Sequence, residues 1–148
     1  MASFWILEPE APGGWGERTD ADLAARPPSI LRVHLELERS VTDDLLQLVP
    51  CFVVSRRLAD ELGRSQLSGY QLDALEVSGA PRYLAAHPDA PLPELVWLKV
   101  FGRAGHADFG LSSDDRLVIS KAALTVLKKF SLVRAGKTKY EPDLGGWG

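Results

Sequence analysis

The amino-acid sequence predicts an α+β fold: a single domain with a mostly antiparallel, twisted sheet of about five to seven strands and two principal amphipathic helices packed on it. Two segments, 52–64 and 117–132, each join a short apolar run to a serine and then to an amphipathic pattern, which indicates a strand followed by a helix. Several other segments alternate apolar and polar residues, as strands do when one face is buried. We expect the domain to span residues 1–148, with a flexible tail at about 141–148.

The two strand and helix segments resemble each other. Phe52-Val53-Val54 and Leu117-Val118-Ile119 each predict a short buried strand. Ser55 and Ser120 follow, at positions where a side-chain oxygen can accept from the first backbone N–H groups of a helix. The segments align without a gap, down to a leucine twelve residues after each serine. We interpret them as an internal repeat and expect both to pack into one core.

Five further strands are expected from apolar or alternating runs, at residues 4–7, 31–38, 70–77, 95–101 and 133–140. The second run alternates throughout, so His34 should lie on the solvent face of its strand. The third shifts register at Ala74-Leu75, which predicts a bulge. The fourth is nearly all apolar, as is typical of the middle strand of a sheet. The last carries two lysines, which indicate an edge strand.

Short helical segments are expected at residues 20–26, 42–48 and 81–86. Asp43 and Asp44 would then lie in the first turn of a helix, where carboxylates complement the helix dipole. That position would explain both acids without a catalytic role.

Residues 11–19 are rich in glycine and proline and are expected to form a loop. Trp15 in this loop is either an exposed anchor for a partner or a ring packed over the core. The Gly-Gly-Trp-Gly tetrapeptide around it recurs around Trp147, and the sequence leaves open whether the two rings are buried.

Residues 102–115 form a second expected loop, in which ionisable groups are concentrated. A metal site there would use His106, Asp108 and Asp114, but glycine, serine and aspartate are ordinary turn residues and this spacing is not diagnostic. Asp114 and Asp115 are adjacent, so on a strand their side chains would point in opposite directions and could not act as a catalytic pair. We therefore expect no metal, no cofactor and no catalytic residues.

Composition restricts the class of partner. The formal net charge of −3 and the isoelectric point of about 5.6 give no basic footprint for nucleic acid or an anionic membrane. The single cysteine, Cys51, excludes an intrachain disulfide and a cysteine-rich zinc site, and we expect it to be buried and inert. The apolar run at residues 4–7 lacks a basic flank and is too short for a signal peptide or a membrane span, which predicts a cytoplasmic protein.

Several short motifs, in order along almost the whole chain, form a pattern: residues 5–9 with 13–19, 43–46 with 50–55, 67–70, 96–100, 108–111 and 117–120. This pattern resembles a family of bacterial proteins, common in actinobacteria and myxobacteria, that is classed among the immunity proteins of polymorphic toxin systems. The family is related to the myxobacterial double-CXXCG proteins. This chain has neither CXXCG motif, so no metal site is carried over from those relatives.

The resemblance implies a cytoplasmic, non-catalytic protein that binds a cognate protein toxin and covers its active site. We expect the interface to use the two loops, through Trp15, Glu17, Arg18, Arg103, His106, Asp108, Asp114 and Asp115. One alternative is a structural or regulatory interaction module that forms a homodimer, whereas the toxin-binding protein would be a monomer or a homodimer. Another is a small-ligand-binding protein or enzyme that uses Arg103, His106 and Asp108 in one apolar pocket.

Overall fold

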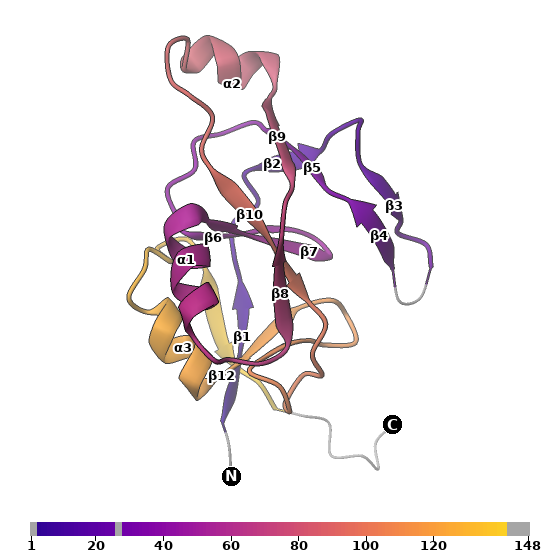
Figure 1. Cartoon of the computed structure of the whole chain (residues 1–148), viewed down its shortest axis with the longest axis vertical. Coiled ribbons are helices and arrows are strands. Elements are labelled where there is room, and N and C mark those ends of the chain that lie inside the picture. Colours follow the sequence, from indigo (N-terminus) through magenta and orange to yellow (C-terminus); the bar gives the residue numbers. More distant parts are fainter. Residues whose placement is uncertain (1–2, 26–27, 142–148) are drawn as a thin grey trace.

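The computed structural model describes residues 3–25 and 28–141, which form an α+β fold of thirteen strands and three helices (Figure 1). The strands are β1 (Phe4–Glu8), β2 (Gly13–Trp15), β3 (Asp20–Asp22), β4 (Ser29–Arg32), β5 (His34–Leu37), β6 (Leu45–Leu48), β7 (Cys51–Ser55), β8 (Tyr70–Asp73), β9 (Glu76–Gly79), β10 (Leu95–Val100), β11 (Phe109–Leu111), β12 (Leu117–Ser120) and β13 (Gly136–Lys139), and the helices are α1 (Arg56–Arg64), α2 (Pro81–Ala86) and α3 (Lys121–Leu127).

The described strands divide among four sheets, instead of forming the expected sheet of about five to seven strands. Two sheets have four strands each, in the orders β6-β7-β10-β8 and β11-β12-β1-β13, and all their pairs are antiparallel. The third sheet, β2-β5-β9, contains a parallel pair between β5 and β9. The fourth is the two-stranded ribbon β3-β4, which projects on the opposite side of the molecule from α1 and α3 (Figure 1).

The two four-stranded sheets have the same design. We define the first repeat as β1, β6, β7, α1 and β8, and the second repeat as β10, β11, β12, α3 and β13. Each sheet takes its third strand from the other repeat, because β10 lies between β7 and β8 while β1 lies between β12 and β13. The registers also correspond: Leu95 pairs with Ser55, as Phe4 pairs with Ser120. The two four-stranded sheets are thus two copies of one arrangement with their first strands exchanged, and β2, β3, β4, β5, β9 and α2 belong to neither repeat.

Serine caps begin both main helices, as the sequence predicted. The Ser55 hydroxyl oxygen accepts from the Leu58 N–H at 3.3 Å, and the Ser120 oxygen accepts from the Ala123 N–H at 3.1 Å. Apolar residues of both helices join one hydrophobic cluster with residues from both sheets: Leu7, Leu45, Phe52, Val54, Leu58, Ala59, Leu62, Val96, Leu98, Phe109, Leu117, Ile119, Ala123, Leu124 and Leu127. The prediction that the two similar segments share a core is therefore confirmed.

The sheet β6-β7-β10-β8 separates this cluster from a second one. Along β10, Val96 and Leu98 belong to the first cluster, whereas Leu95 and Trp97 belong to the second. Consecutive strand residues face opposite sides, so β10 is covered on both faces, as predicted for a middle strand. The second cluster also holds the core-facing residues of β5 and Tyr83 of α2. Helix α2 and the edge position of β13 agree with the sequence.

Residues 45–48 form a strand, and the helix predicted at 42–48 is wrong. Leu45 belongs to the first cluster, whereas Leu46 and Leu48 belong to the second. A strand delivers consecutive side chains to opposite faces, which a helix cannot do. Pairing with β7 therefore determines that residues 45–48 are extended. Asp43 and Asp44, which precede this strand, consequently do not lie in a helical turn.

Two other predicted irregular or helical segments are strands. Residues 13–15, expected in a loop, form β2 because Gly13 lets the backbone approach β5 very closely: a Cβ atom at Gly13 would lie 1.9 Å from the Glu36 carbonyl oxygen. Residues 20–22, expected in a helical turn, form β3 and pair with β4. The expected loop 102–115 likewise contains β11.

The run 70–77 is two strands, not one bulged strand. Its shift of register at Ala74-Leu75 is the point where the chain leaves β8 in one sheet and enters β9 in another. The run 31–38 is also divided, between β4 and β5. The expected tail beyond residue 141, with Trp147, lies outside the described residues.

Candidate binding site

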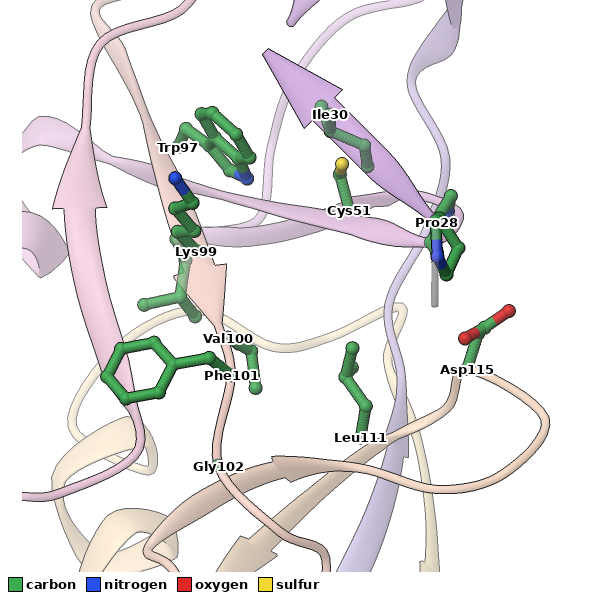
Figure 2. A pocket seen from close by; sticks show the side chains of 12 residues that line it. Pro28, Ile30, Cys51, Trp97, Lys99, Val100, Phe101, Gly102, Leu111 and Asp115 are labelled. Atoms are coloured by element: carbon green, nitrogen blue, oxygen red, sulfur yellow. The ribbon is translucent and has the colours of Figure 1, made fainter. Parts of the chain in front are cut away.

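A mostly apolar hollow of about 390 Å³ lies where the two repeats meet (Figure 2). Its walls are the turn between β6 and β7, the end of β10, the β11–β12 hairpin, and the β4 ribbon strand. The volume is within the range of ligand and anchor pockets, and such pockets commonly form where structural units join. We call it the apolar hollow, and the apolar side chains that matter most are Pro28, Ile30, Trp97, Val100, Phe101 and Leu111.

The end of β10 and the two residues after it supply one wall, from Trp97 to Gly102. Trp97, Lys99 and Phe101 follow one another at intervals of two, and all three line the hollow. The Lys99 ammonium lies 5.0 Å from the centre of the Trp97 ring, which is a cation–π distance. Phe101 follows the last residue of β10 and is 67% exposed, which is unusual for an aromatic ring beside a core strand.

Lys99 and Asp115 lie on different walls of the apolar hollow (Figure 2). Within residues 3–25 and 28–141 neither side chain forms an ion pair or a hydrogen bond. Asp115 has a positive φ of 63° in the β11–β12 turn, a conformation that aspartate tolerates better than most residues, and its N–H donates to the Ser112 carbonyl oxygen at 3.0 Å. Two charges of opposite sign are thus held apart by an apolar floor.

Cys51 also lines the apolar hollow but is not reactive there. Burial raises the pKa of its thiol to about 12, so the thiolate is not formed near neutral pH. The predicted burial of this cysteine is confirmed.

A second, polar hollow of about 260 Å³ contains two of the predicted interface residues, Glu17 and Arg18. Arg18 forms an ion pair with Glu76 at 2.8 Å. His34 lines the same hollow and is 4% exposed, so its predicted position in solvent is wrong. Its ring packs against Gly16, where a Cβ atom would lie 2.2 Å from Nδ1.

The hydrogen bonds of His34 define its role. Nδ1 accepts from the Arg18 backbone N–H at 3.1 Å, so the proton of the neutral ring is on Nε2, which lies 2.8 Å from Ser78 Oγ. Nε2 therefore donates to Ser78. A general base would have to accept the serine proton at that nitrogen, so the pair is not arranged to make Ser78 a nucleophile.

The structure does not bring the eight predicted interface residues together. Trp15 is half-buried and packs against the second hydrophobic cluster, which favours the ring over the core. Arg103 and His106 are exposed, and neither they nor Asp108 line the apolar hollow or the polar hollow. Asp114 accepts a hydrogen bond from the Ser112 hydroxyl, which together with nearby Arg116 holds its pKa below the ordinary value. Only Asp115 lines the apolar hollow.

Asp108 is used inside the fold. Its carboxylate accepts from the Ser120 hydroxyl at 2.6 Å and from the Ser68 N–H at 2.9 Å. Burial opposes its ionisation, but these hydrogen bonds outweigh burial and hold the pKa below its ordinary value. The carboxylate therefore has a structural role at the cap of α3.

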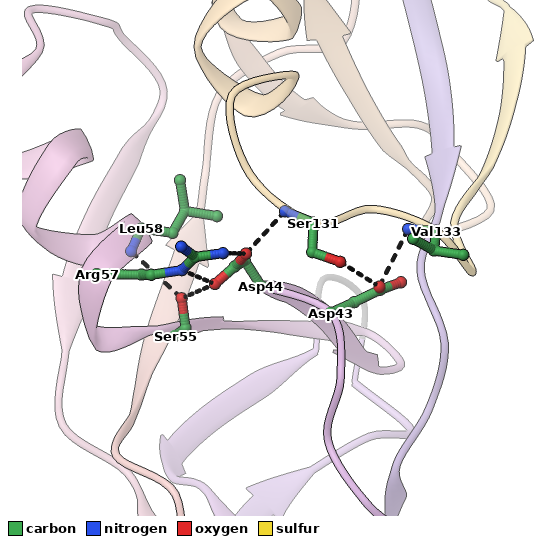
Figure 3. Close-up of polar contacts among 7 residues, drawn as sticks. All are labelled: Asp43, Asp44, Ser55, Arg57, Leu58, Ser131 and Val133. Carbon is green, nitrogen blue, oxygen red and sulfur yellow. Dashed lines mark hydrogen bonds and ion pairs between the residues drawn. The ribbon is translucent and has the colours of Figure 1, made fainter.

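Asp44 has the equivalent role at the cap of α1 (Figure 3). Its carboxylate accepts from the Ser55 hydroxyl at 2.6 Å, from Arg57 at 2.8 and 2.6 Å, and from the Ser131 N–H at 2.8 Å. Asp43 beside it accepts from the N–H groups of Val133 at 3.0 Å and Arg134 at 2.7 Å. Both acids are buried, and they tie the first repeat to the segment that follows α3.

The residues of the apolar hollow, apart from Asp115, were not among the predicted interface residues. They come from four separate parts of the chain, and no spacing in the sequence relates them. The one local sequence signal for the hollow was an aromatic residue, Phe101, at the end of an apolar run. The same run is equally typical of a fully buried strand, so the sequence did not reveal that Phe101 is exposed.

Comparisons of the chain with protein-family models, with curated proteins and with solved structures found no match. Across the described ranges, no three histidine, cysteine, aspartate or glutamate side chains are placed to hold a metal ion. None of the helices in the same ranges is long and apolar enough to cross a membrane.

Proposed function

We propose that this chain is a non-catalytic binding protein of the bacterial cytoplasm that neutralises a cognate protein toxin by covering the toxin's active site. The observation that carries the proposal is the apolar hollow with Phe101 exposed beside it. An exposed aromatic ring next to an apolar depression is the usual composition of a protein-binding hot spot, because an inserted side chain is fully desolvated there.

The rest of the site supports binding over chemistry. The carboxylates of Asp43, Asp44 and Asp108 are occupied by structural hydrogen bonds, and His34 donates to Ser78 instead of accepting from it. The class of partner comes from the resemblance of the chain to immunity proteins of polymorphic toxin systems. In such a complex the hollow would anchor the toxin, and the surrounding surface would exclude substrate from it.

The test is co-expression of this chain with the product of the adjacent gene. We expect that product to be lethal when expressed alone and harmless together with this chain, and the two to elute as a stoichiometric complex. Phe101→Glu should weaken binding at least tenfold, because it puts a charge where the partner's apolar surface would lie. Phe101 is exposed, so this variant should fold normally.

Val133→Glu is the matched control, since Val133 is 85% exposed and does not line the apolar hollow. It should protect cells as the wild type does. Absence of binding by the wild type, together with a stable dimer in light scattering that Phe101→Glu dissociates, would instead favour a homodimeric module.

A further inference from the structure

Lys99 and Asp115 in the walls of the apolar hollow indicate which kind of toxin segment would enter it. Resting on the proposed function, we infer that the partner inserts a segment with a large apolar side chain between two charged groups, an acidic group that meets Lys99 and a basic group that meets Asp115.

The apolar floor of the hollow favours a large apolar side chain at the centre of the inserted segment. Trp97, Val100 and Leu111 contribute apolar surface, and a hollow of about 390 Å³ has room for at least one large side chain. A small polar or charged group placed against that floor would lose its hydration without gaining hydrogen bonds. A large aliphatic or aromatic side chain is therefore the complementary occupant.

The charges of Lys99 and Asp115 favour oppositely charged groups at the two ends of the inserted segment. A partner that covers the hollow also removes water from Lys99 and Asp115, and a charge buried without a counter-charge is costly. Within the described part of the chain neither group has an ion-pair partner that could supply this compensation. By contrast, Arg18, Arg57 and Arg116 already contact carboxylates of the chain. Compensating charges on the partner would remove this cost.

Each charged residue has one contact within the fold before binding. The Lys99 ammonium lies over the Trp97 ring, and the N–H of Asp115 donates to the Ser112 carbonyl oxygen in the hairpin turn. Groups that are already positioned lose little conformational freedom on binding, so they discriminate strongly between complementary and like charges. The orientation of the inserted segment is consequently set: its acidic side faces β10 and its basic side faces the β11–β12 turn.

The experiment uses the toxin captured by co-expression and measures its affinity for charge variants by titration calorimetry. Lys99→Glu and Asp115→Lys should each weaken binding at least tenfold, whereas the neutral Lys99→Met and Asp115→Asn should weaken it about threefold. Lys129→Glu and Asp89→Lys make the same charge changes at exposed positions outside the hollow and should leave affinity unchanged. Circular dichroism and urea unfolding check that all six variants are folded.

The outcomes separate the inference from the proposed function. If the wild type binds and Phe101→Glu weakens binding, but the Lys99 and Asp115 variants bind like the wild type, the inference is wrong and the function stands. If Phe101→Glu also has no effect, the toxin uses another surface and the inference is again wrong. If the wild type itself fails to bind, the proposed function fails and the inference fails with it.

Discussion

At the scale of single residues, Asp44 and Asp108 perform the same task in the two repeats. Each accepts a hydrogen bond of 2.6 Å from the serine that caps its helix, and each backbone carbonyl accepts from the N–H of that serine at 2.9 Å. Each also accepts an N–H from a segment that follows the helix of the other repeat, at Ser131 or Ser68. One carboxylate thus stabilises a local cap and a long-range contact together.

Asp44→Asn should lower the free energy of unfolding by about 2 kcal/mol, because it replaces charge-assisted hydrogen bonds to Ser55 and Ser131 with weaker neutral ones. The exposed side of the network, Arg57, should contribute less because solvent screens it. Urea unfolding measures the change. Asp60→Asn removes an exposed carboxylate of α1 and should change stability by less than about 0.5 kcal/mol. Equal losses in both variants would contradict a structural role for Asp44.

The same two carboxylates predict how stability depends on pH. For Asp44, burial opposes ionisation, but the hydrogen bonds from Arg57, Ser55 and Ser131 hold the folded-state pKa below the ordinary 3.8. As the pH falls, the carboxylates therefore bind protons in the unfolded chain before they do so in the folded chain. Their contribution to stability is complete above the unfolded-state pKa and is lost as the pH falls through the folded-state pKa. We expect the free energy of unfolding to fall as the pH is lowered from above 3.8 to below it, and to fall less in the Asp44→Asn, Asp108→Asn double variant. A double variant with an unchanged slope would contradict this assignment.

Residue-scale reasoning from the sequence identified both serine caps but misplaced His34. It correctly put Val33, Leu35 and Leu37 on the core side of their strand. The other side of the strand is covered by the backbone around Gly16 and Arg18, which no local pattern reveals. Asp43 and Asp44 were misplaced for the same reason, since the backbone N–H groups that bind them at residues 131–134 are 87 to 91 positions away.

At the scale of elements, strand β2 depends on a glycine whose importance the sequence did not show. Gly13→Ala should lower the free energy of unfolding by about 2 kcal/mol or more, because its Cβ would collide with the backbone carbonyl of Glu36 and separate β2 from β5. Gly14→Ala is the control within the same strand, since a Cβ there meets no atom within 4 Å. Thermal unfolding of the two variants gives the comparison, and similar midpoints would show that β2 tolerates a side chain at residue 13.

Elements were predicted well where local and tertiary preferences agree, as in the two serine-capped segments. They were predicted poorly where pairing with a distant strand determines the secondary structure. Leu45-Leu46-Gln47-Leu48 has the composition of a helix and becomes a strand because its leucines serve two different cores. The apolar hollow belongs to this second class, because it exists only where the β4 ribbon strand, β10 and two hairpin turns meet.

At the scale of the whole molecule, the exchange of β1 and β10 makes the two halves of the chain dependent on each other. Residues 1–89 lack β10, which fills the gap between β7 and β8, and residues 90–148 lack β1, which fills the gap between β12 and β13. Each half alone would expose unpaired strand edges and one part of the shared hydrophobic cluster. The α+β class followed from the sequence, but this exchange did not, because strand order is a property of distant pairings.

Cleavage of the chain between residues 89 and 90 should therefore give two fragments that are unfolded separately and fold on mixing. Circular dichroism and NMR of each fragment and of the equimolar mixture measure this. Leu98→Ala in the second fragment should weaken assembly, because Leu98 is fully buried against the first repeat, whereas Val133→Ala should not. A second fragment that folds alone would show that β1 is dispensable, and the two repeats would then have to be regarded as independent units instead of halves of one exchanged structure.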